Sequence, residues 1–222
     1  LMGGNSFTGA VRVEGGTLQM ASSRASDYEV RAGAQLQLGE RNLGTAVVQA
    51  LPGATVVYTG ASLAGGQLLG GGTHDVSAVQ RIVGTQLGVG STLRPADGAT
   101  LVGVANSGHV VNAAGHSLVW TGGGNGVGTF TVAGNTTVSA FSSAGVIDLQ
   151  PGATLTSTGT DLMLAAGSRT LIGSAAVPGG LLRLADGSRV QLNGGLLVNN
   201  GSIDGALHVG YGGLAKGAGS CG

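Results

Sequence analysis

A five-residue frame recurs along the chain, and it constrains the fold more than any other feature of the sequence. The frame consists of a turn residue, a glycine, two further residues and then leucine or valine. In its six clear copies the aliphatic position is Leu36, Val56, Leu101, Leu118, Leu155 and Val190. Four copies carry another bulky residue two positions later, namely Leu38, Tyr58, Trp120 and Leu192. Alternation with a period of two predicts a strand that buries one face.

Looser copies of the frame fill the intervals between the clear ones, near Gly16, Gly72, Gly134, Gly167 and Gly201. Successive turn glycines are then separated by roughly 14–26 residues, mostly about 17–20, which is the length of one coil of a solenoid. About eleven such coils fit in the chain, and at roughly 4.8 Å per coil they form a rod on the order of 50 Å long. The sequence therefore predicts an all-β fold, a right-handed parallel β-helix, with residues 1–222 as a single segment of a longer protein.

Stacking of equal coils also makes predictions about neighbouring residues. Each strand would find hydrogen-bond partners above and below, and equal positions of the frame would lie over one another. We therefore expect the six aliphatic positions of the frame to line up along one wall of the interior. In the first two coils the same stacking brings together opposite charges and two valines: Arg12 with Glu29, Glu14 with Arg31, and Val13 with Val30.

Two other β architectures are weaker alternatives. A left-handed β-helix needs a strict six-residue aliphatic rhythm, which the variable spacing of the frame does not supply. A sandwich of antiparallel strands is the third choice, because hairpin signals are few and occur mainly at Asn193-Gly194 and Asn200-Gly201. The best candidate for a helical stripe is residues 75–83, and it covers no more than two turns.

Composition excludes several classes of protein. Glycine accounts for 46 residues without a three-residue period, and 42% of the residues are hydrophobic, so the chain is neither collagen-like nor starved of core material. The formal net charge is zero and Lys216 is the single lysine, which argues against a nucleic-acid interface or a basic membrane anchor. No apolar run is long enough for a membrane-spanning helix. The single cysteine, Cys221, rules out an intrachain disulfide and a paired thiolate zinc site.

The opening segment resembles a known repeat. Residues 5–20 begin with Asn5, an aromatic residue at Phe7 and a Thr-Gly pair, continue through a β-branched strand and end in Gly-Gly-Thr-Leu at positions 15–18. This pattern resembles the passenger-associated transport repeat of bacterial autotransporters, and residues 212–220 also look like part of a passenger coil. The resemblance implies a right-handed β-helix displayed on the cell surface and exported by a C-terminal β-barrel that would lie outside these residues.

Acidic residues give no clear sign of an active site. The ten acids are scattered over different positions of the frame: Glu14, Asp27, Glu29, Glu40, Asp75, Asp97, Asp148, Asp161, Asp186 and Asp204. Asp97 and Asp186 share a frame position but lie several coils apart, far beyond the roughly 5–9.5 Å of a glycosidase pair. We interpret both as corner residues of Asp-Gly turns and expect a protein that is not an enzyme.

Histidine and glycine motifs are equally unspecific. His74-Asp75 could be a catalytic base and its orienting partner, but neighbouring strand residues point to opposite faces, so we predict a solvated loop. His109, His116 and His208 lack metal-ligand spacing and are predicted to be exposed. The Gly210–Ala215 segment matches a dinucleotide fingerprint without room for a helix, and Gly122–Gly128 is interpreted as a loop. We therefore expect no metal and no cofactor.

One binding site can be suggested from the basic residues. Arg169 and Arg189 occupy the same position after Gly167 and Gly187, and Arg183 is close in sequence. Three arginines on neighbouring coils could form a patch for an anionic glycan, while a solvated face is the alternative interpretation. Trp120 and Tyr58 share an inward frame position, which favours core packing over stacking on sugars.

Together these features favour a non-enzymatic rod, a stalk or adhesin of an autotransporter passenger, at the bacterial surface or secreted. Its partners would be components of host or neighbouring cells, with no nucleic acid and no membrane insertion by this segment. A monomer is expected, and its open coil edges would permit end-to-end association. The alternative is a carbohydrate-active β-helix whose active site lies partly outside this segment. A haemagglutinin-like filament exported by a separate pore would share the same fold.

Overall fold

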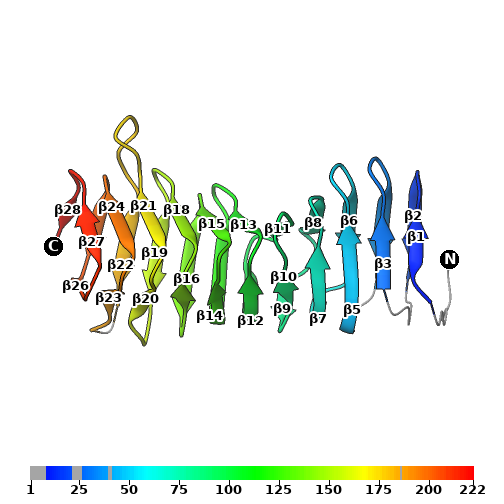
Figure 1. Ribbon diagram of the computed structural model, residues 1–222, viewed down its shortest axis with the longest axis horizontal. Helices are drawn as coiled ribbons and strands as arrows, with labels where there is room; N and C mark the ends of the chain where they lie inside the picture. Colours follow the sequence, from blue (N-terminus) through cyan, green and yellow to red (C-terminus); the bar gives the residue numbers. More distant parts are fainter. Residues whose placement is uncertain (1–8, 22–26, 40–41, 186) are drawn as a thin grey trace.

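The computed structural model describes residues 9–21, 27–39, 42–185 and 187–222. Within these residues there is no helix, and all regular structure is β. Strand pairs run parallel, as in Arg12 beside Glu29 and Leu36 beside Val56. The coils stack along one axis from the N-terminal to the C-terminal end of an elongated molecule (Figure 1). The chain is therefore a parallel β-helix of about eleven turns, as the repeat predicted.

One wall of the solenoid is an eleven-stranded sheet that receives one strand from every coil. Most of its strands have four residues and the burial pattern of alternate positions, with the second and fourth residues inside. The strands, in order along the rod, are β2 (Thr17–Met20), β4 (Gln35–Leu38), β6 (Thr55–Tyr58), β8 (Thr73–Val76), β11 (Thr92–Pro95), β13 (His109–Asn112), β15 (Thr129–Val132), β18 (Val146–Leu149), β21 (Arg169–Ile172), β24 (Leu196–Asn199) and β27 (Leu214–Lys216).

The rest of each coil belongs to a seventeen-stranded sheet. Its strands are β1 (Val11–Val13), β3 (Asp27–Val30), β5 (Asn42–Ala50), β7 (Ser62–Leu69), β9 (Arg81–Val83), β10 (Gln86–Leu87), β12 (Ala99–Asn106), β14 (Ser117–Asn125), β16 (Asn135–Ser139), β17 (Ser142–Ser143), β19 (Thr154–Ser157), β20 (Leu162–Leu164), β22 (Leu181–Leu184), β23 (Arg189–Leu192), β25 (Ser202–Asp204), β26 (Ala206–Val209) and β28 (Ser220–Cys221). The first half of β12 pairs with β9 and its second half with β10. Each coil thus crosses this sheet in two arms, a first arm that includes β9 and a second arm that includes β10.

Inward side chains of successive coils form continuous columns. In the eleven-stranded sheet, Leu93 lies beside Val110, which lies beside Phe130, which lies beside Ile147. All four side chains are fully buried. Each such residue contributes about 1.5–3 kcal/mol of apolar burial, opposed by the entropy lost on ordering the chain. These columns fill the tube up to the last coil, whose strand β27 is exposed.

The prediction that the frame marks one wall is wrong. Leu36 and Val56 lie in the eleven-stranded sheet, while the other four positions lie in the seventeen-stranded sheet. All six side chains are buried. The prediction that they point inward is therefore confirmed, whereas the prediction that they share one wall is not. The physical reason is that a coil turns several times, and glycine with a positive φ fits each of these corners. Gly33 (φ 75°) precedes the eleven-stranded sheet, and Gly115 (φ 78°) precedes the first arm of the other sheet.

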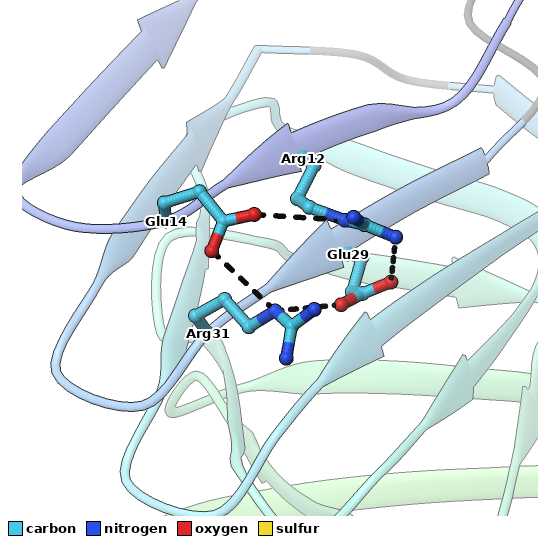
Figure 2. Close-up of polar contacts among 4 residues, drawn as sticks. All are labelled: Arg12, Glu14, Glu29 and Arg31. Carbon is cyan, nitrogen blue, oxygen red and sulfur yellow. Dashed lines mark hydrogen bonds and ion pairs between the residues drawn. The ribbon is translucent and has the colours of Figure 1, made fainter.

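The predicted register of the first two coils is confirmed. Val13 lies beside Val30 and Arg12 lies beside Glu29, with 3.2 Å between Arg12 Nη2 and Glu29 Oε2. Arg31 Nε lies 3.6 Å from Glu14 Oε2 and 2.9 Å from Glu29 Oε1. Figure 2 shows the four charged side chains as a closed ring, in which Arg12 also lies 3.8 Å from Glu14. The ring stabilises the stacking of these two coils, by about 0.2–1 kcal/mol for each exposed pair.

Buried amides line one corner between the second arm and the eleven-stranded sheet. Asn106 Nδ2 donates to Asn125 Oδ1 at 2.7 Å, and Asn125 Nδ2 donates to Ser143 Oγ at 3.1 Å. Asn125 Nδ2 also donates to the carbonyl of Val146, while Asn106 Oδ1 accepts the backbone N–H of Gly108. The ladder therefore satisfies backbone groups that the turn would otherwise leave unpaired inside the protein.

The sequence shows no helical stripe longer than two turns, and residues 75–83, the best candidate for one, form the end of β8, a turn and β9. One local prediction is wrong. Residues 122–125 of the glycine-rich run, interpreted as a loop, continue strand β14. Their glycines lie where the chain of one coil passes close to the next, because a Cβ on Gly123 would collide with the backbone of Val104. A glycine-rich strand gives little apolar periodicity, which is why sequence reasoning missed it.

Candidate functional site

An open groove of about 560 Å³ lies on the outer face of the eleven-stranded sheet, across β6, β8, β11 and β13. It is lined by Thr55, Thr73, Asp75, Ser77, Arg94, Pro95, Val111, Ala113 and His116. Four neighbouring strands at the usual spacing span about 14 Å along the rod. Its volume falls in the range of small-molecule sites, so this groove is a candidate binding site.

Strand register brings the groove residues together. Thr55 lies beside Thr73, and Asp75 lies beside Arg94. Thr73 and Asp75 are two positions apart on β8, so both point outward while His74 between them points inward. Sequence reasoning missed the groove because its neighbours on adjacent strands are 17 to 19 positions apart and have no motif in common. Aligning the copies of the five-residue frame does not predict the groove either, because the copies mark different corners of the coil.

The groove combines a carboxylate with a guanidinium. Asp75 Oδ1 accepts the backbone N–H of Ser77 at 2.9 Å, which closes a tight turn at the end of β8. Arg94 is exposed and, among the described residues, has no carboxylate oxygen within 4.0 Å. Half-buried His116 lies at the far end, and its Nδ1 has no hydrogen-bond partner among the described residues. The groove therefore offers polar groups to a ligand and resembles a non-covalent binding site.

Next to the groove, His109 is occupied by contacts within the protein. His109 Nε2 lies 2.9 Å from Thr131 Oγ1 on the following coil. Burial, and to a smaller degree the positive charge of Arg94, lower the pKa of His109 below its ordinary value. The neutral imidazole is therefore favoured, and it serves as a hydrogen-bonding side chain of the outer face.

The three arginines suggested as a glycan patch are not brought together. Arg169 is on β21 of the eleven-stranded sheet, Arg183 on β22 in the first arm and Arg189 on β23 in the second arm. These are three successive sides of one closed coil, so outward side chains diverge. Two of the three also have anionic partners, since Arg183 Nε lies 3.2 Å from Asp204 and Arg189 Nε lies 3.2 Å from Asp161. The sequence suggestion failed because residues that are close together along the chain can lie on different sides of a coil.

Several described carboxylates hold strands and turns together. Asp27 accepts the backbone N–H of Val47, and Asp97 accepts both the backbone N–H and the hydroxyl of Ser117. The hydrogen bonds from Ser117, first from its backbone and then from its hydroxyl, lower the pKa of Asp97. Asp97 lies in a turn as predicted. Glu40 and Asp186 lie outside the described residues.

Asp161 accepts three hydrogen bonds from Arg189 and Gln191. It accepts from Gln191 Nε2 at 2.8 Å and from both the backbone N–H and the Nε of Arg189. The Gln191 hydrogen bond is the largest cause that lowers the pKa of Asp161, followed by the bond from the backbone of Arg189. These contacts fix the stacking of neighbouring coils in the second arm.

The prediction that His74 lies in a solvated loop is wrong. It lies on β8 in the inward column between Val56 and Leu93, and it is fully buried. Its Nε2 lies 3.2 Å from the carbonyl oxygen of Leu69, and its Nδ1 lies 3.1 Å from the hydroxyl of Tyr58. A carbonyl only accepts, so Nε2 carries the proton and Nδ1 accepts from Tyr58. The opposite orientations of His74 and Asp75 were predicted correctly, so the two do not form a catalytic pair.

The remaining candidates carry no cluster. His116 is half-buried and His208 is exposed. Residues 210–213 form a turn that leads into strand β27, as expected for a corner. In the described part of the chain no group of three or more His, Cys, Asp or Glu side chains could hold a metal ion, and no helix could cross a membrane. Trp120 and Tyr58 are both buried, as predicted, although they lie in different sheets.

No family model, no curated protein and no solved structure matches this chain. The residues that carry the resemblance to a transport repeat are only partly described, because Asn5, Phe7 and Thr8 lie outside the described residues. Positions 17 and 18 of that segment form the start of β2, where Leu18 lies beside Leu36 of the next coil.

Proposed function

We propose that the chain is a non-enzymatic rod of a surface-displayed or secreted bacterial protein, in which it acts as a stalk or adhesin. The observation that carries this proposal is the uninterrupted stack of about eleven parallel coils along one axis (Figure 1). Such a stack resists bending because the strands between the two end coils are hydrogen-bonded on both sides and their inward side chains are packed together. A structure of this kind holds a surface at a fixed distance from its anchor.

The use of charged residues supports the same proposal. Most described acids bind backbone N–H groups or arginines of neighbouring coils, so their role is to fix the register. The resemblance of residues 5–20 to the passenger-associated transport repeat supports an autotransporter passenger at the bacterial surface. Partners would then be components of host or neighbouring cells.

A carbohydrate-active β-helix is the second candidate, and the groove on the eleven-stranded sheet favours it. Hydrolysis or elimination at a sugar needs at least two groups that transfer protons, and calcium-dependent cleavage needs several carboxylates. Of the acids, the groove is lined by Asp75 alone. Binding without cleavage is therefore the better assignment for this groove.

The two candidates separate in one experiment. Beads coated with the purified chain are passed over cultured epithelial cells and over bacterial lawns, and the retained fraction is measured under flow. The same protein is incubated with a panel of plant, bacterial and host polysaccharides, and new reducing ends and unsaturated products are measured. We expect retention above that of albumin-coated beads, without cleavage of any polysaccharide. Cleavage that disappears with Asp75→Asn would overturn the rod proposal in favour of the enzyme.

A further inference from the structure

The outer face of the eleven-stranded sheet carries a column of hydrogen-bonding side chains. Strand register places one such residue from each of seven consecutive coils beside the next: Thr17, Gln35, Thr55, Thr73, Thr92, His109 and Thr129. Beyond Thr129 the same column continues with Val146. The polar part of the column therefore ends within the rod, and the groove lies in its middle.

Within the groove this column provides free hydroxyl groups. The hydroxyls of Thr55 and Thr73 form no hydrogen bond with any other described residue. Both side chains are half-buried, so they are held in place by the packing of the sheet. Each hydroxyl can donate one hydrogen bond and accept two, which suits a ligand that itself consists of hydroxyl groups.

The groove also has an apolar floor beside these polar groups. Three apolar residues line it: Pro95 is buried, Val111 is half-buried and Ala113 is exposed. A sugar ring presents C–H groups on its faces and hydroxyls around its rim, so it can use both kinds of surface at once.

Charge narrows the ligand class. Asp75 and Arg94 lie beside each other on β8 and β11 and balance, so the groove has no net charge when His116 is neutral. An anionic polymer would meet the carboxylate of Asp75 as well as the guanidinium of Arg94. A neutral sugar suits both, because carboxylates accept from hydroxyl groups and guanidinium groups donate to them.

A peptide is a poorer occupant. The groove lies on the face of a sheet, and the backbone N–H and C=O groups of β6, β8 and β11 are paired with neighbouring strands. A peptide therefore finds no strand edge to extend. Recognition is therefore left to the side chains of the groove, and three of its nine lining residues carry a hydroxyl: Thr55, Thr73 and Ser77.

We infer that this groove binds a short segment of an uncharged polysaccharide, recognised by Thr55, Thr73, Asp75 and Arg94 over the floor of Pro95 and Val111. The inference rests on the proposed function, since it names the ligand class of the adhesin. The sugar chain lies across the stacked strands, along the axis of the rod.

The test uses the whole chain and defined oligosaccharides. Short cello-, malto- and N-acetylated chito-oligosaccharides serve as neutral probes, and oligogalacturonate and heparin oligosaccharides as anionic ones. Binding is measured by titration calorimetry and by chemical-shift changes of labelled backbone amides. We expect saturable binding of at least one neutral probe, with shifts concentrated on β6, β8, β11 and β13.

Variants locate the site. Thr73→Val keeps the shape of the side chain but removes the hydroxyl, and we expect about fivefold weaker binding. Arg94→Gln removes a charged donor, and we expect at least about tenfold weaker binding. Arg81→Gln is the matched control, because Arg81 is exposed on β9 in the other sheet and does not line the groove. All variants should retain the wild-type melting temperature.

Three results would overturn the inference: no binding of any neutral probe, tighter binding of the anionic probes, or equal binding by wild type, Thr73→Val and Arg94→Gln. In each of these cases the bead assay still tests the proposed adhesion separately from the groove. Adhesion that survives both groove substitutions would leave the rod as an adhesin and would remove the groove from that role.

Discussion

The hydroxyl of Tyr58 lies 3.1 Å from Nδ1 of His74 inside the solenoid, where the neighbours of His74 on the adjacent coils, Val56 and Leu93, are aliphatic. Burial lowers the pKa of His74 to about 4, against the smaller opposite effect of its hydrogen bond to the carbonyl of Leu69. Burial also raises the pKa of the Tyr58 hydroxyl well above its ordinary value, with a further contribution from Tyr28. The pair is therefore uncharged at neutral pH.

This pair predicts an acid-sensitive stability. The unfolded chain takes up a proton at His74 near its ordinary pKa of about 6.5, whereas the folded chain resists protonation until about pH 4. The contribution of neutral, buried His74 to the free energy of unfolding is fully present above about pH 6.5, and it is lost as the pH falls toward 4. The loss is on the order of 3 kcal/mol over that range.

Urea unfolding at a series of pH values between 7 and 4 checks this expectation. His74→Leu restores an aliphatic column, so its stability should lose most of the slope in this range, even if the variant is less stable at pH 7. His208→Gln is the control, because His208 is exposed on β26, and it should keep the wild-type slope. An unchanged slope in His74→Leu would contradict the buried neutral histidine.

The charged ring of the first two coils should give a measurable but small coupling. A double-mutant cycle with Arg12→Gln and Glu29→Gln should yield about 0.2–1 kcal/mol, because both side chains remain partly exposed. At about 1 M salt, where screening acts over roughly 3 Å, the coupling should fall. A cycle between Arg81 and Glu29 provides the baseline. A coupling of zero at low salt would mean that packing alone sets this register.

An aromatic cluster should dominate the stability of the central coils. The ring of Trp120 lies edge-on to Phe130 at 5.1 Å and to Phe141 at 4.9 Å, measured between ring centroids. Trp120→Ala should cost about 3–5 kcal/mol in the free energy of unfolding. Trp120→Phe should cost only about 1–2 kcal/mol, since the buried indole Nε1 has no partner among the described residues and its removal relieves that penalty.

The single tryptophan also reports on this cluster directly. Its emission should be blue-shifted and protected from iodide in the folded protein, and it should shift to the red on unfolding. Ready quenching in the native state would show that Trp120 is not buried as described.

Replacing two corner glycines by alanine should destabilise the protein to different degrees, and the glycine without a positive φ should be the more sensitive one. Gly115 has a φ of 78° with no atom near its missing side chain, so Gly115→Ala should cost about 1–2 kcal/mol of local strain. Gly134 does not have a positive φ, but a Cβ there would collide with the backbone oxygens of His116 and Ala113. Gly134→Ala should therefore cost more than Gly115→Ala. Thermal unfolding of both variants gives the comparison, and the reverse order would contradict the close stacking of these coils.

Local pattern predicted much of the architecture. Alternation in segments such as Thr55–Tyr58 indicated which side chains point inward, and turn glycines about one coil apart indicated stacked strands. The opposite charges of Arg12 and Glu29 indicated the register of the first coils, which the structure confirms. These features are local in sequence or lie one coil apart.

The site was harder to foresee. The groove depends on Thr73, Asp75 and Arg94 lying on one face, and this follows from the pairing of β8 with β11. The arginine patch failed for the related reason that Arg169, Arg183 and Arg189 lie on three sides of one coil. Burial of His74 was missed because a polar residue in an inward column gives no apolar signal.

The sequence by itself therefore determined that the chain forms short parallel strands with one buried face, closed by glycine turns and repeated about eleven times. Only the tertiary structure decided which wall each strand joins, so that Leu36 and Leu101 occupy equal positions of the frame but different sheets. Every corner of a coil accepts the same glycine turn. Which corner it becomes depends on hydrogen bonds and side-chain columns shared with the coils above and below, and those contacts exist only once the chain has stacked.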